Sequence, residues 1–426
     1  MAVGVLCAVQ GSAEAIIVQA VEQTGGRLSV TRRCADLTEL LAAAEAGLGR
    51  LAVVSGDLDL LDREAIELLH RAGVRVVGIG DATRPWLGER LVALGADLVA
   101  VAPHDEASAS DVVREALAIL GAAPEEVAEP SWPDEHTVRR PARGLVVAVW
   151  GPTGAPGRTT VAVNVAAELA AGGRRTLLVD ADTYGASVAQ VVGMLDEAPG
   201  LAAAARAAGQ GTLDLMMLAR LTPTIAPGLR VLSGISRADR WPELPSSSLD
   251  AVWAVARGIA EWTVIDCGFC LEQDEALSYD TRAPRRNAAT LSALEAADVV
   301  LVVGAGDPVG IQRLVRGLGE LTDLGLGGTR FVLVNRVRAS VAGPHAADAV
   351  GQALARYAGV TDAHLVPDDR PALDTALLEA QTLREAAPGS PVRRALAGVA
   401  ARVDALLVAA PTEQPVEELA EEPARA

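Results

Sequence analysis

Residues 145–160 read Leu-Val-Val-Ala-Val-Trp-Gly-Pro-Thr-Gly-Ala-Pro-Gly-Arg-Thr-Thr, and this stretch decides the fold. Its apolar first part, 145–150, predicts a fully buried β-strand, and a loop rich in glycine and proline follows. Thr159 and Thr160 then begin a stretch rich in alanine and valine that predicts a helix. A strand, a glycine loop and a helix start in this order present backbone N–H groups and a helix N-terminus to a phosphate chain. We therefore expect a phosphate-binding loop here.

The loop departs from the usual pattern G-x-x-x-x-G-K-[ST] at two positions. Pro152 stands where the first glycine is expected, and Arg158 stands where the lysine is expected. Gly154 and Gly157 still allow the backbone to approach an anion, whereas Pro156 has no N–H to donate. Arg158 keeps the positive charge, but its planar guanidinium is bulkier than an ammonium group. The sequence thus poses the question of whether this loop still functions.

Composition limits the classes of protein that the chain can be. Its 426 residues are half hydrophobic but only 3% aromatic, so alanine, valine and leucine must fill its cores. The net charge of −18 argues against a broad electrostatic contact with DNA or with an anionic membrane. No uninterrupted apolar run approaches the ~18 residues of a membrane span, so we expect no direct membrane insertion. Four cysteines in a chain of this length predict no disulfide framework and favour a cytoplasmic location.

Residues 1–122 alternate short apolar runs with helical patterns five times, which predicts a doubly wound parallel sheet with helices on both faces. The expected strands are Val3–Val9, Leu28–Thr31, Leu51–Val54, Val74–Ile79 and Leu98–Ala102. The expected helices are Glu14–Gln23, Leu37–Ala46, Asp62–Ala72, Trp86–Leu94 and Asp111–Leu120.

In length and order these elements resemble the receiver domain of two-component signalling, although its motifs are missing. A working receiver carries acidic residues after its first strand, an aspartate at the end of its third and a lysine after its fifth. Here Gln10, Ser55 and Pro103 follow or end those strands, so no Mg²⁺-binding carboxylate cluster can form. Asp57 lies close to the phospho-acceptor position but lacks acidic partners. We favour a docking or dimerisation module over a phosphorylated receiver.

Beyond this domain, residues 123–143 combine prolines with mixed charge and predict a linker. Strands followed by helical segments return over 144–409, and the tail 410–426 is acidic and expected to be disordered. The strands expected after the first are Thr176–Val179, Leu229–Leu232, Thr263–Ile265, Val299–Val303, Phe331–Val334 and His364–Val366. The predicted fold class is therefore α/β, with two doubly wound parallel-sheet domains.

Six motifs of the second domain occur in the order found in the MinD/ParA family of P-loop ATPases, over nearly all of residues 144–405. They are GPTGAPGRTT, LLVDADTYGAS, WTVIDCGF, AADVVLVVGAGDPVG, FVLVNRV and LVPDD. The resemblance implies a P-loop NTPase with a deviant Walker A loop that uses ATP and Mg²⁺. A receiver-like domain in front of it resembles the CpaE/TadZ-like branch, which is associated with Flp/Tad pilus assembly.

The resemblance also implies a role for each matching residue. The nucleotide would be bound by Gly154, Ala155, Gly157, Arg158, Thr159, Thr160, Asn335, Pro367 and Asp368. Mg²⁺ would be held, mostly through water, by Thr159, Asp180 and Asp266. Asp182 would orient the attacking water, with Arg158 as the catalytic cation. The alternative for each aspartate is an ordinary exit from a strand into a turn, where this residue type is common. The alternative for Asn335 is an ordinary turn residue, and the alternative for Pro367 is a residue that ends a strand.

A second, "signature" lysine near the start of the loop contacts the partner subunit's nucleotide in the relatives, and Thr153 stands at that position here. With Arg158 in place of the other lysine, we expect ATP to bind, while its hydrolysis stays uncertain.

Three further groups of residues need an interpretation. Cys267 and Cys270 form a C-x-x-C pair, but no second half-site is spaced for zinc, so we favour small residues lining a loop over a redox or metal role. Arg282, Arg285 and Arg286 predict a solvated face. A patch of Arg313, Arg316, Arg336 and Arg338 could touch DNA, as in the partition ATPases, although the acidic charge of the whole chain makes DNA an unfavoured partner.

These observations lead to one hypothesis and two alternatives. The hypothesis is an ATP-binding homodimer of the CpaE/TadZ type that helps to place or assemble a Flp/Tad pilus or secretion system. It would act through the secretion ATPase or other assembly proteins, which would recruit it to the inner face of the membrane or to the cell pole. The alternatives are a chromosome-partitioning or septum-site-determining ATPase of the ParA/MinD type, and a pseudo-ATPase scaffold that binds no nucleotide.

Overall fold

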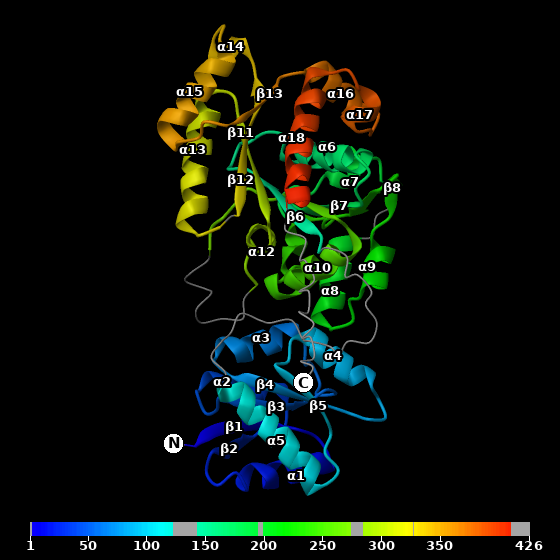
Figure 1. Ribbon diagram of the computed structural model, residues 1–426, viewed down its shortest axis with the longest axis vertical. Helices are drawn as coiled ribbons and strands as arrows, with labels where there is room; N and C mark the ends of the chain where they lie inside the picture. The colour runs from blue at the N-terminus through cyan, green and yellow to red at the C-terminus, as the bar shows by residue number, and fades with distance from the viewer. Residues whose placement is uncertain (1, 122–142, 195–198, 274–283, 327, 410–426) are drawn as a thin grey trace, which may run out of the picture.

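The apolar runs of the sequence become the strands of two separate sheets in the computed structural model, which describes residues 2–121, 143–194, 199–273, 284–326 and 328–409. The expected linker, apart from Arg143, and the expected tail lie outside these ranges, as does Arg282. The two sheets belong to two α/β units that follow one another along the long axis of the molecule (Figure 1).

The first unit has a five-stranded sheet in the order β2-β1-β3-β4-β5, with every neighbouring pair parallel. Its strands are β1 (Val3–Ala8), β2 (Leu28–Arg33), β3 (Leu51–Ser55), β4 (Arg75–Gly80) and β5 (Leu98–Val101). Its helices are α1 (Ser12–Glu22), α2 (Leu37–Glu45), α3 (Arg63–Arg71), α4 (Trp86–Leu94) and α5 (Glu106–Gly121). The predicted five-fold alternation and parallel sheet are confirmed.

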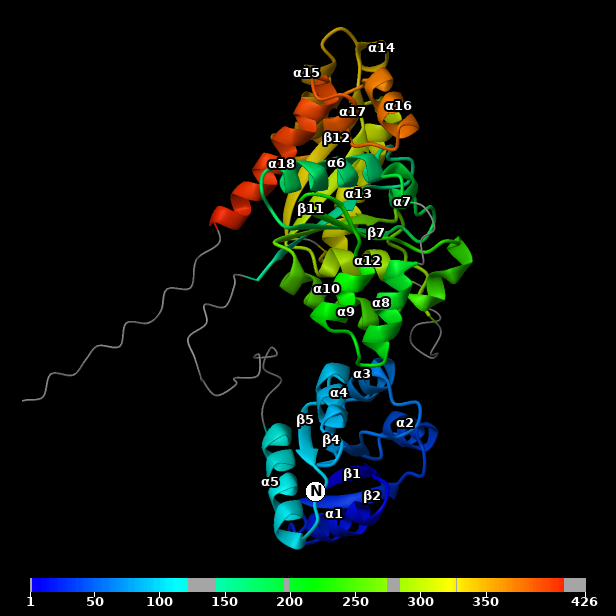
Figure 2. The same cartoon turned by 90° about the vertical axis from the view of Figure 1, so that its right-hand side faces the viewer.

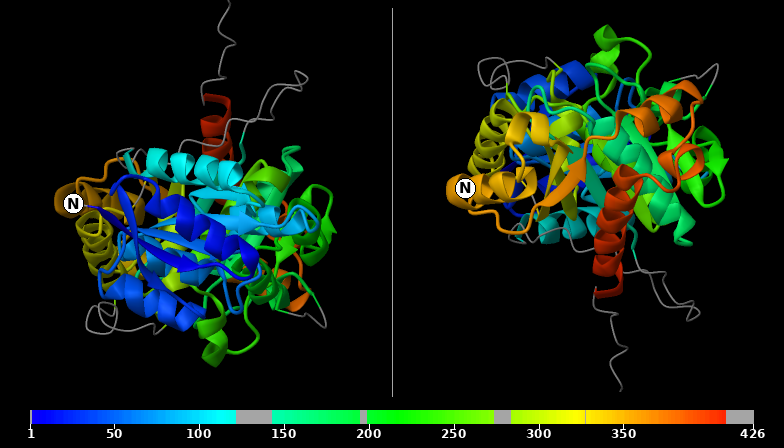
Figure 3. Two further views of the ribbon diagram at one scale, coloured as in Figure 1. Left: turned by 90° about the horizontal axis from the view of Figure 1, so that it is seen from below. Right: turned by 90° about the horizontal axis from the view of Figure 1, so that it is seen from above.

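Alternating strand residues build one core on each face of this sheet. Val5 and Cys7 face a core shared with α1 and α5, whereas Leu6 and Ala8 face a core shared with α2, α3 and α4. The helices α5 and α2 accordingly lie on opposite sides of the sheet (Figure 3).

The second unit has an eight-stranded sheet in the order β13-β12-β11-β6-β10-β7-β9-β8. Its strands are β6 (Leu145–Trp150), β7 (Thr176–Ala181), β8 (Thr224–Ala226), β9 (Leu229–Leu232), β10 (Trp262–Cys267), β11 (Val299–Ala305), β12 (Thr329–Val337) and β13 (His364–Pro367). The six strands predicted after β6 are all present.

One strand corrects the prediction of a purely parallel sheet. Strand β8 was not expected, and it pairs antiparallel with β9 at the edge, so the second sheet is mixed. It has three residues, none of them fully buried, and a two-residue turn ending in Gly228 at φ +77° returns the chain to β9. A strand this short and this exposed leaves no apolar pattern to read in the sequence.

Helices cover both faces of the second sheet. One face packs against α6 (Arg158–Ala171), α7 (Val188–Val191), α16 (Arg370–Leu378), α17 (Leu383–Ala386) and α18 (Pro391–Ala409). The other packs against α8 (Gly200–Gly209), α9 (Leu215–Leu221), α10 (Ser246–Ile259), α12 (Ala288–Glu295), α13 (Pro308–Asp323) and α15 (Ala346–Ala358). The 3₁₀ helix η1 (Ala238–Glu243) and the short α14 (Ala339–Ala342) complete the unit. No helix among the described residues combines the length and hydropathy that crossing a bilayer requires.

The two units meet through helices. In the first unit α3 and α4 contact α8 and α10 of the second, and these helices lie between the two sheets (Figure 2). Arg90 on α4 donates from Nε to the carbonyl oxygen of Gln210, 3.2 Å away. The adjacent Gly211 has φ +69°, and a Cβ there would lie about 3.0 Å from the Arg90 carbonyl oxygen and from Leu94. Backbone and side chain therefore approach closely across this contact.

Candidate functional site

The glycine- and proline-rich loop leaves the carboxyl end of β6, where the order of the sheet changes direction. From β6 the chain first builds β7, β9 and β10 on one side, and later β11, β12 and β13 on the other. In open α/β sheets, ligands bind outside the carboxyl ends of the strands at such a switch point. The predicted phosphate loop therefore lies at the position where the fold offers a crevice.

Glycine is required at two positions of the loop. Gly154 has φ +71° and Gly157 has φ +87°, values that other residue types rarely adopt. Gly157 also precedes the first residue of α6, and a Cβ there would collide with the side-chain amide of Asn335. That amide donates from Nδ2 to the carbonyl oxygen of Pro156 at 2.9 Å. Asn335, at the end of β12, thus holds the loop from the side.

Pro152 replaces the expected first glycine because a neighbouring helix accommodates its ring. A Cβ placed on Gly317 of α13 would lie 3.2 and 3.3 Å from Pro152 Cβ and Cγ, and 3.0 Å from Trp150. Pro152 therefore packs directly on α13 at a residue without a side chain. The loop then closes with a hydrogen bond from the Ala155 N–H to the Pro152 carbonyl oxygen at 2.9 Å.

Arg158 lies inside the site, with only 15% of its side chain exposed. Its Nη1 is 3.4 Å from the Gly151 carbonyl oxygen, and its Nη2 is 3.5 Å from Asp182 Oδ2. The guanidinium carbon lies 6.0 Å from the centre of the Phe269 ring. Its Nε is buried and has no hydrogen-bond partner among the described residues. The arginine is thus placed in the site by long contacts that leave one donor free.

Thr159 and Asp266 join the loop to the end of β10. Thr159 Oγ1 donates to Asp266 Oδ2 at 2.6 Å, and the other carboxylate oxygen, Oδ1, is buried without a partner in the described part of the chain. Burial raises the pKa of Asp266 well above its usual range, and the nearby Asp180 carboxylate raises it further. A hydroxyl beside an unpaired carboxylate oxygen is a donor set that fits Mg²⁺, which prefers oxygen ligands.

Asp180 lies beside Asp266 but its oxygens are engaged by backbone. Oδ1 accepts from the Asp182 N–H at 3.2 Å, and Oδ2 accepts from the N–H groups of Ser187 and Val188 at 2.9 and 3.0 Å. Burial raises the pKa of Asp180 to about 6. In this arrangement Asp180 holds the turn after β7 and the start of α7, rather than presenting a free oxygen to a metal ion.

The two carboxylate oxygens of Asp182 have different partners, the backbone of the turn and Arg158. Oδ1 accepts from the N–H groups of Tyr184 and Gly185 at 2.9 and 3.3 Å, while Oδ2 faces Arg158. The structure thus brings Arg158, Thr159, Asp180, Asp182 and Asp266 together around the loop.

The residues expected beside adenine lie further along the same edge of the sheet. Asn335 also accepts at Oδ1 from the Arg336 N–H at 2.9 Å, so both ends of its amide are engaged. Pro367 ends β13, and Asp368 Oδ2 lies 3.6 Å from Arg370 Nε and 3.8 Å from Arg338 Nε. Asn335 therefore contacts the loop, whereas Pro367 and Asp368 lie at the end of β13, which is next to β12 and three strands away from β6.

Sequence reasoning missed the contacts of Tyr184 and Phe269, and its prediction of a solvated face is wrong for Arg286, which is half-buried and packs on Tyr184. The rings of Tyr184 and Phe269 lie 4.8 Å apart, and the Arg286 guanidinium lies 3.8 Å from the Tyr184 ring centre. Arg286 also donates from Nη1 to Thr183 Oγ1 at 2.6 Å, and the Tyr184 hydroxyl donates to Asn287 Oδ1 at 2.8 Å. The two aromatic residues stand in the stretches TYG and CGFC, but only the cysteines of the second stretch were considered as functional residues.

Those cysteines do not gather as a metal site. Cys267 is buried with its thiol 3.6 Å from the Ile265 carbonyl oxygen, and burial raises its pKa. Cys270 Sγ accepts from Asn287 Nδ2 at 3.3 Å. No cluster of three or more histidine, cysteine or acidic side chains able to hold a metal ion occurs within the described ranges.

In the first unit, the carboxylate of Asp57 is paired with an arginine. Asp57 Oδ2 accepts from Arg84 at 2.7 Å, and Arg84 also donates to Asp81 at 2.8 Å. Ser55 Oγ accepts from the Gln10 N–H at 2.9 Å. An arginine therefore pairs with Asp57, in the loop that follows β3.

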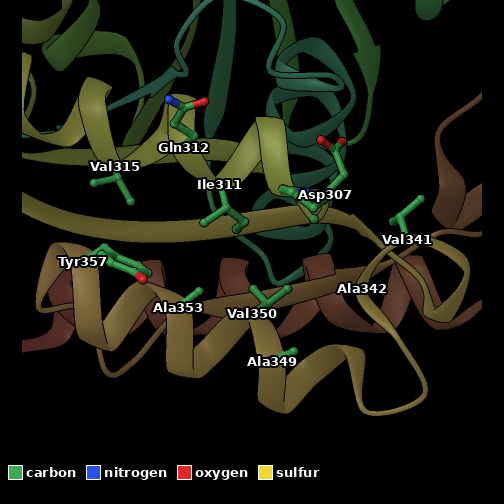
Figure 4. A pocket seen from close by; sticks show the side chains of 12 residues that line it. Asp307, Ile311, Gln312, Val315, Val341, Ala342, Ala349, Val350, Ala353 and Tyr357 are labelled. Atoms are coloured by element: carbon green, nitrogen blue, oxygen red, sulfur yellow. The ribbon is translucent and has the colours of Figure 1, made fainter.

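A separate apolar groove of about 580 Å³ lies between α13 and α15 (Figure 4). Ile311 and Val315 on α13 face Val350 and Ala353 on α15, whereas Gln312 points away from α15. The groove begins beside Asp307, after β11, and does not include the loop.

Comparisons with known proteins agree with this geometry. Residues 144–224 match the family model ParA, described as NUBPL iron-transfer P-loop NTPase. A ParA family ATPase from Chlorobium tepidum is similar in structure at 16% identity, covering 60% of this chain and 98% of that chain with a TM-score of 0.51. The cell division ATPase MinD of Pyrococcus furiosus (20% identity, 62% and 99% covered, TM-score 0.48) is also similar. So is the septum site-determining protein MinD of Pyrococcus horikoshii, complexed with Mg-ADP (20%, 62% and 97%, 0.48).

No curated protein matches the chain. The second unit therefore shares the fold of the ParA family ATPase from Chlorobium tepidum, and residues 144–224 match the ParA family model.

The hydrogen bond between Thr159 and Asp266 gives a test of the site without any ligand. In Thr159→Val, neither oxygen of the buried Asp266 has a partner among the described residues, so we expect a loss of about 1–3 kcal/mol in the free energy of unfolding. Urea unfolding followed by tryptophan fluorescence measures it, because Trp150, Trp253 and Trp262 are buried in this unit. Thr159→Ser keeps the hydroxyl and serves as the control. Equal stability of the valine and serine variants would show that the bond contributes nothing.

Proposed function

We propose that this protein binds ATP with Mg²⁺ at residues 151–160 and works as a nucleotide-dependent switch, with hydrolysis slow or absent. One observation carries the proposal. Four buried side-chain N or O atoms in the described part of the chain lack a partner, and two of them, Arg158 Nε and Asp266 Oδ1, lie at this loop. One is a donor and the other an acceptor, as an anion accompanied by a cation would require.

Leaving such groups unpaired is costly, at about 1–3 kcal/mol each and more where the group is charged. A phosphate oxygen would accept from Arg158, and the loop and the first turn of α6 would present backbone N–H groups to the same anion. Pairing these two groups with a ligand would thus contribute to the affinity for it.

The residues that would hold Mg²⁺ are the Thr159 hydroxyl and, through water, Asp266. When bound, the ion would offset the charge of the phosphates. Asp180 stays a candidate for the outer shell, but its three backbone hydrogen bonds favour a positioning role. Asp182 remains the residue to orient a water molecule, since Oδ2 is its only oxygen not engaged by the backbone.

Slow hydrolysis follows from the arginine. The Arg158 guanidinium lies 3.5 Å from Asp182 Oδ2, so the cation and the water-orienting carboxylate face each other. This ion pair must separate before Asp182 can orient a water molecule. Binding does not need this rearrangement, so the two activities should separate.

For the biological role, we propose a CpaE/TadZ-like homodimer that helps to place or assemble a Flp/Tad pilus or secretion system. The proposal rests on the order of the domains: residues 1–122 as a receiver-like module without a carboxylate cluster, then 144–409 as the NTPase. The contact of α3 and α4 with α8 and α10 supports a docking role for the first module. Recruitment to the membrane or the cell pole would come from partners such as the secretion ATPase.

A ParA/MinD-type role in chromosome partitioning or septum placement is the alternative proposal. It requires DNA or lipid binding by a chain of net charge −18. Of the arginines expected in a DNA patch, Arg338 lies 3.8 Å from Asp368, which lowers its availability to phosphates.

The first prediction concerns affinity. Arg158→Ala should weaken the binding of ATP·Mg²⁺ at least about tenfold, the effect of losing one charge-assisted hydrogen bond, whereas Arg158→Lys should retain most of it. Isothermal titration calorimetry with and without Mg²⁺ measures both. If the wild-type chain binds no nucleotide, the proposal fails and the pseudo-ATPase scaffold takes its place.

The second prediction separates binding from turnover. Asp182→Asn keeps an oxygen for the turn but removes the charge, so ATP affinity should persist while any turnover falls at least about tenfold. Sedimentation with ATP should then show dimers that persist longer than those of the wild type. The exposed Asp348 on α15 provides the control, as Asp348→Asn. Unchanged turnover in Asp182→Asn would remove this residue from the mechanism.

The third prediction addresses the process. In a host that carries a Flp/Tad system, replacing the gene by Arg158→Ala should abolish surface pili at a normal level of the protein, as electron microscopy and immunoblotting would show. Normal piliation together with chromosome loss, and with salt-sensitive DNA binding in vitro, would instead favour the partitioning role.

A further inference from the structure

We infer that Arg313, on α13, is a second cation of the phosphate site and contacts the phosphate chain of a nucleotide bound in the same subunit. This inference rests on the proposed nucleotide binding. It assigns a ligand contact to an arginine that the sequence offered only as part of a DNA-binding patch.

The Arg313 side chain lies on the loop, at Gly154. A Cβ on Gly154 would collide with Nη1 of Arg313 and lie 3.2 Å from its guanidinium carbon. Gly154 has φ +71°, so its lack of a side chain serves two needs: the turn itself and the approach of the guanidinium. The cationic end of Arg313 therefore lies against the backbone that would wrap the phosphates.

The helix holds this position through close packing on either side of the arginine. Gly310 allows the backbone of α13 to lie against Ala305, and Gly317, one turn after Arg313, receives the ring of Pro152. Residues four apart lie on one face of a helix, so Gly317 and Arg313 cover Pro152 and Gly154 in turn. The proline that breaks the loop pattern thus also fixes the helix that carries the arginine.

The charge of Arg313 is available to an anion. Its side chain is exposed, and no hydrogen bond or ion pair to another described residue is found for it. Arg158, the other cation at the loop, faces Asp182. A guanidinium binds phosphate oxygens through two parallel N–H groups, which suits the phosphate chain of a nucleotide.

The test compares two arginines of the same helix. Arg313→Gln should weaken ATP·Mg²⁺ binding about tenfold, as expected for one charge-assisted contact. Arg316→Gln, the same change three residues further on, should leave the affinity within about twofold of wild type, since long-range effects of exposed charges are screened. Calorimetry on the full chain measures both, and equal urea midpoints would show that the variants fold alike.

A mixing experiment tests whether the contact is made within one subunit. Arg158→Ala and Arg313→Gln each damage one cation, so a mixed dimer would regain one intact site if Arg313 acted across subunits. We expect no recovery of binding in the mixture, and recovery would overturn the assignment to the same subunit.

The remaining outcomes are distinct. Wild-type binding that Arg313→Gln leaves unchanged, or that both glutamine variants reduce equally, overturns the inference alone. A wild-type chain that binds neither ATP nor ADP overturns the proposed function and this inference with it.

Discussion

Three buried carboxylates gather at the loop beside the half-buried Arg158, and the rest of the site depends on how their charges are compensated. Unpaired charges in a protein interior are strongly disfavoured, so each carboxylate needs its own solution. Asp180 is compensated by three backbone N–H groups, Asp182 faces Arg158, and Asp266 keeps one hydroxyl and a raised pKa. Asp266 is the least compensated of the three. A phosphate chain would add negative charge to this excess, so the site favours a nucleotide that arrives with a divalent cation.

The substitutions in the loop are connected through α13. Pro152 would be an isolated defect if α13 did not present Gly317 to its ring, and Gly154 would be needed only for its turn if Arg313 did not lie on it. Position 153, between them, carries an uncharged threonine. Pro152 and Gly154 are therefore both matched to α13, which adds the Arg313 guanidinium to the positive charge of Arg158 at the loop.

The sequence predicted what depends on local patterns and missed what depends on distant contacts. Strand β6 is apolar on both faces because Val147 and Val149 enter one core while Val146, Ala148 and Trp150 enter the other, and such runs are readable. The resemblance to the MinD/ParA family grouped the three aspartates at one site, and their side chains do lie together around the loop. The sequence could not reveal that the N–H groups of Ser187 and Val188 bind the Asp180 carboxylate, because that depends on the path of the turn after β7. Nor could it place Arg313 on Gly154, because the two lie on different segments of the chain.

In the first unit, two arginines bind the loop that follows β3. Arg84 donates to Asp57, and the preceding residue, Gly56, accepts a hydrogen bond at its carbonyl oxygen from Arg90 Nη1 at 2.7 Å. Arg90 also donates to the Leu61 carbonyl oxygen and, from Nε, to the Gln210 carbonyl oxygen of the second unit. One guanidinium thus connects the loop after β3 to the turn after α8. Because these bonds join the two units through backbone carbonyl oxygens, the joint depends on the shape of that loop. Such a fixed contact supports the docking role proposed for the first unit.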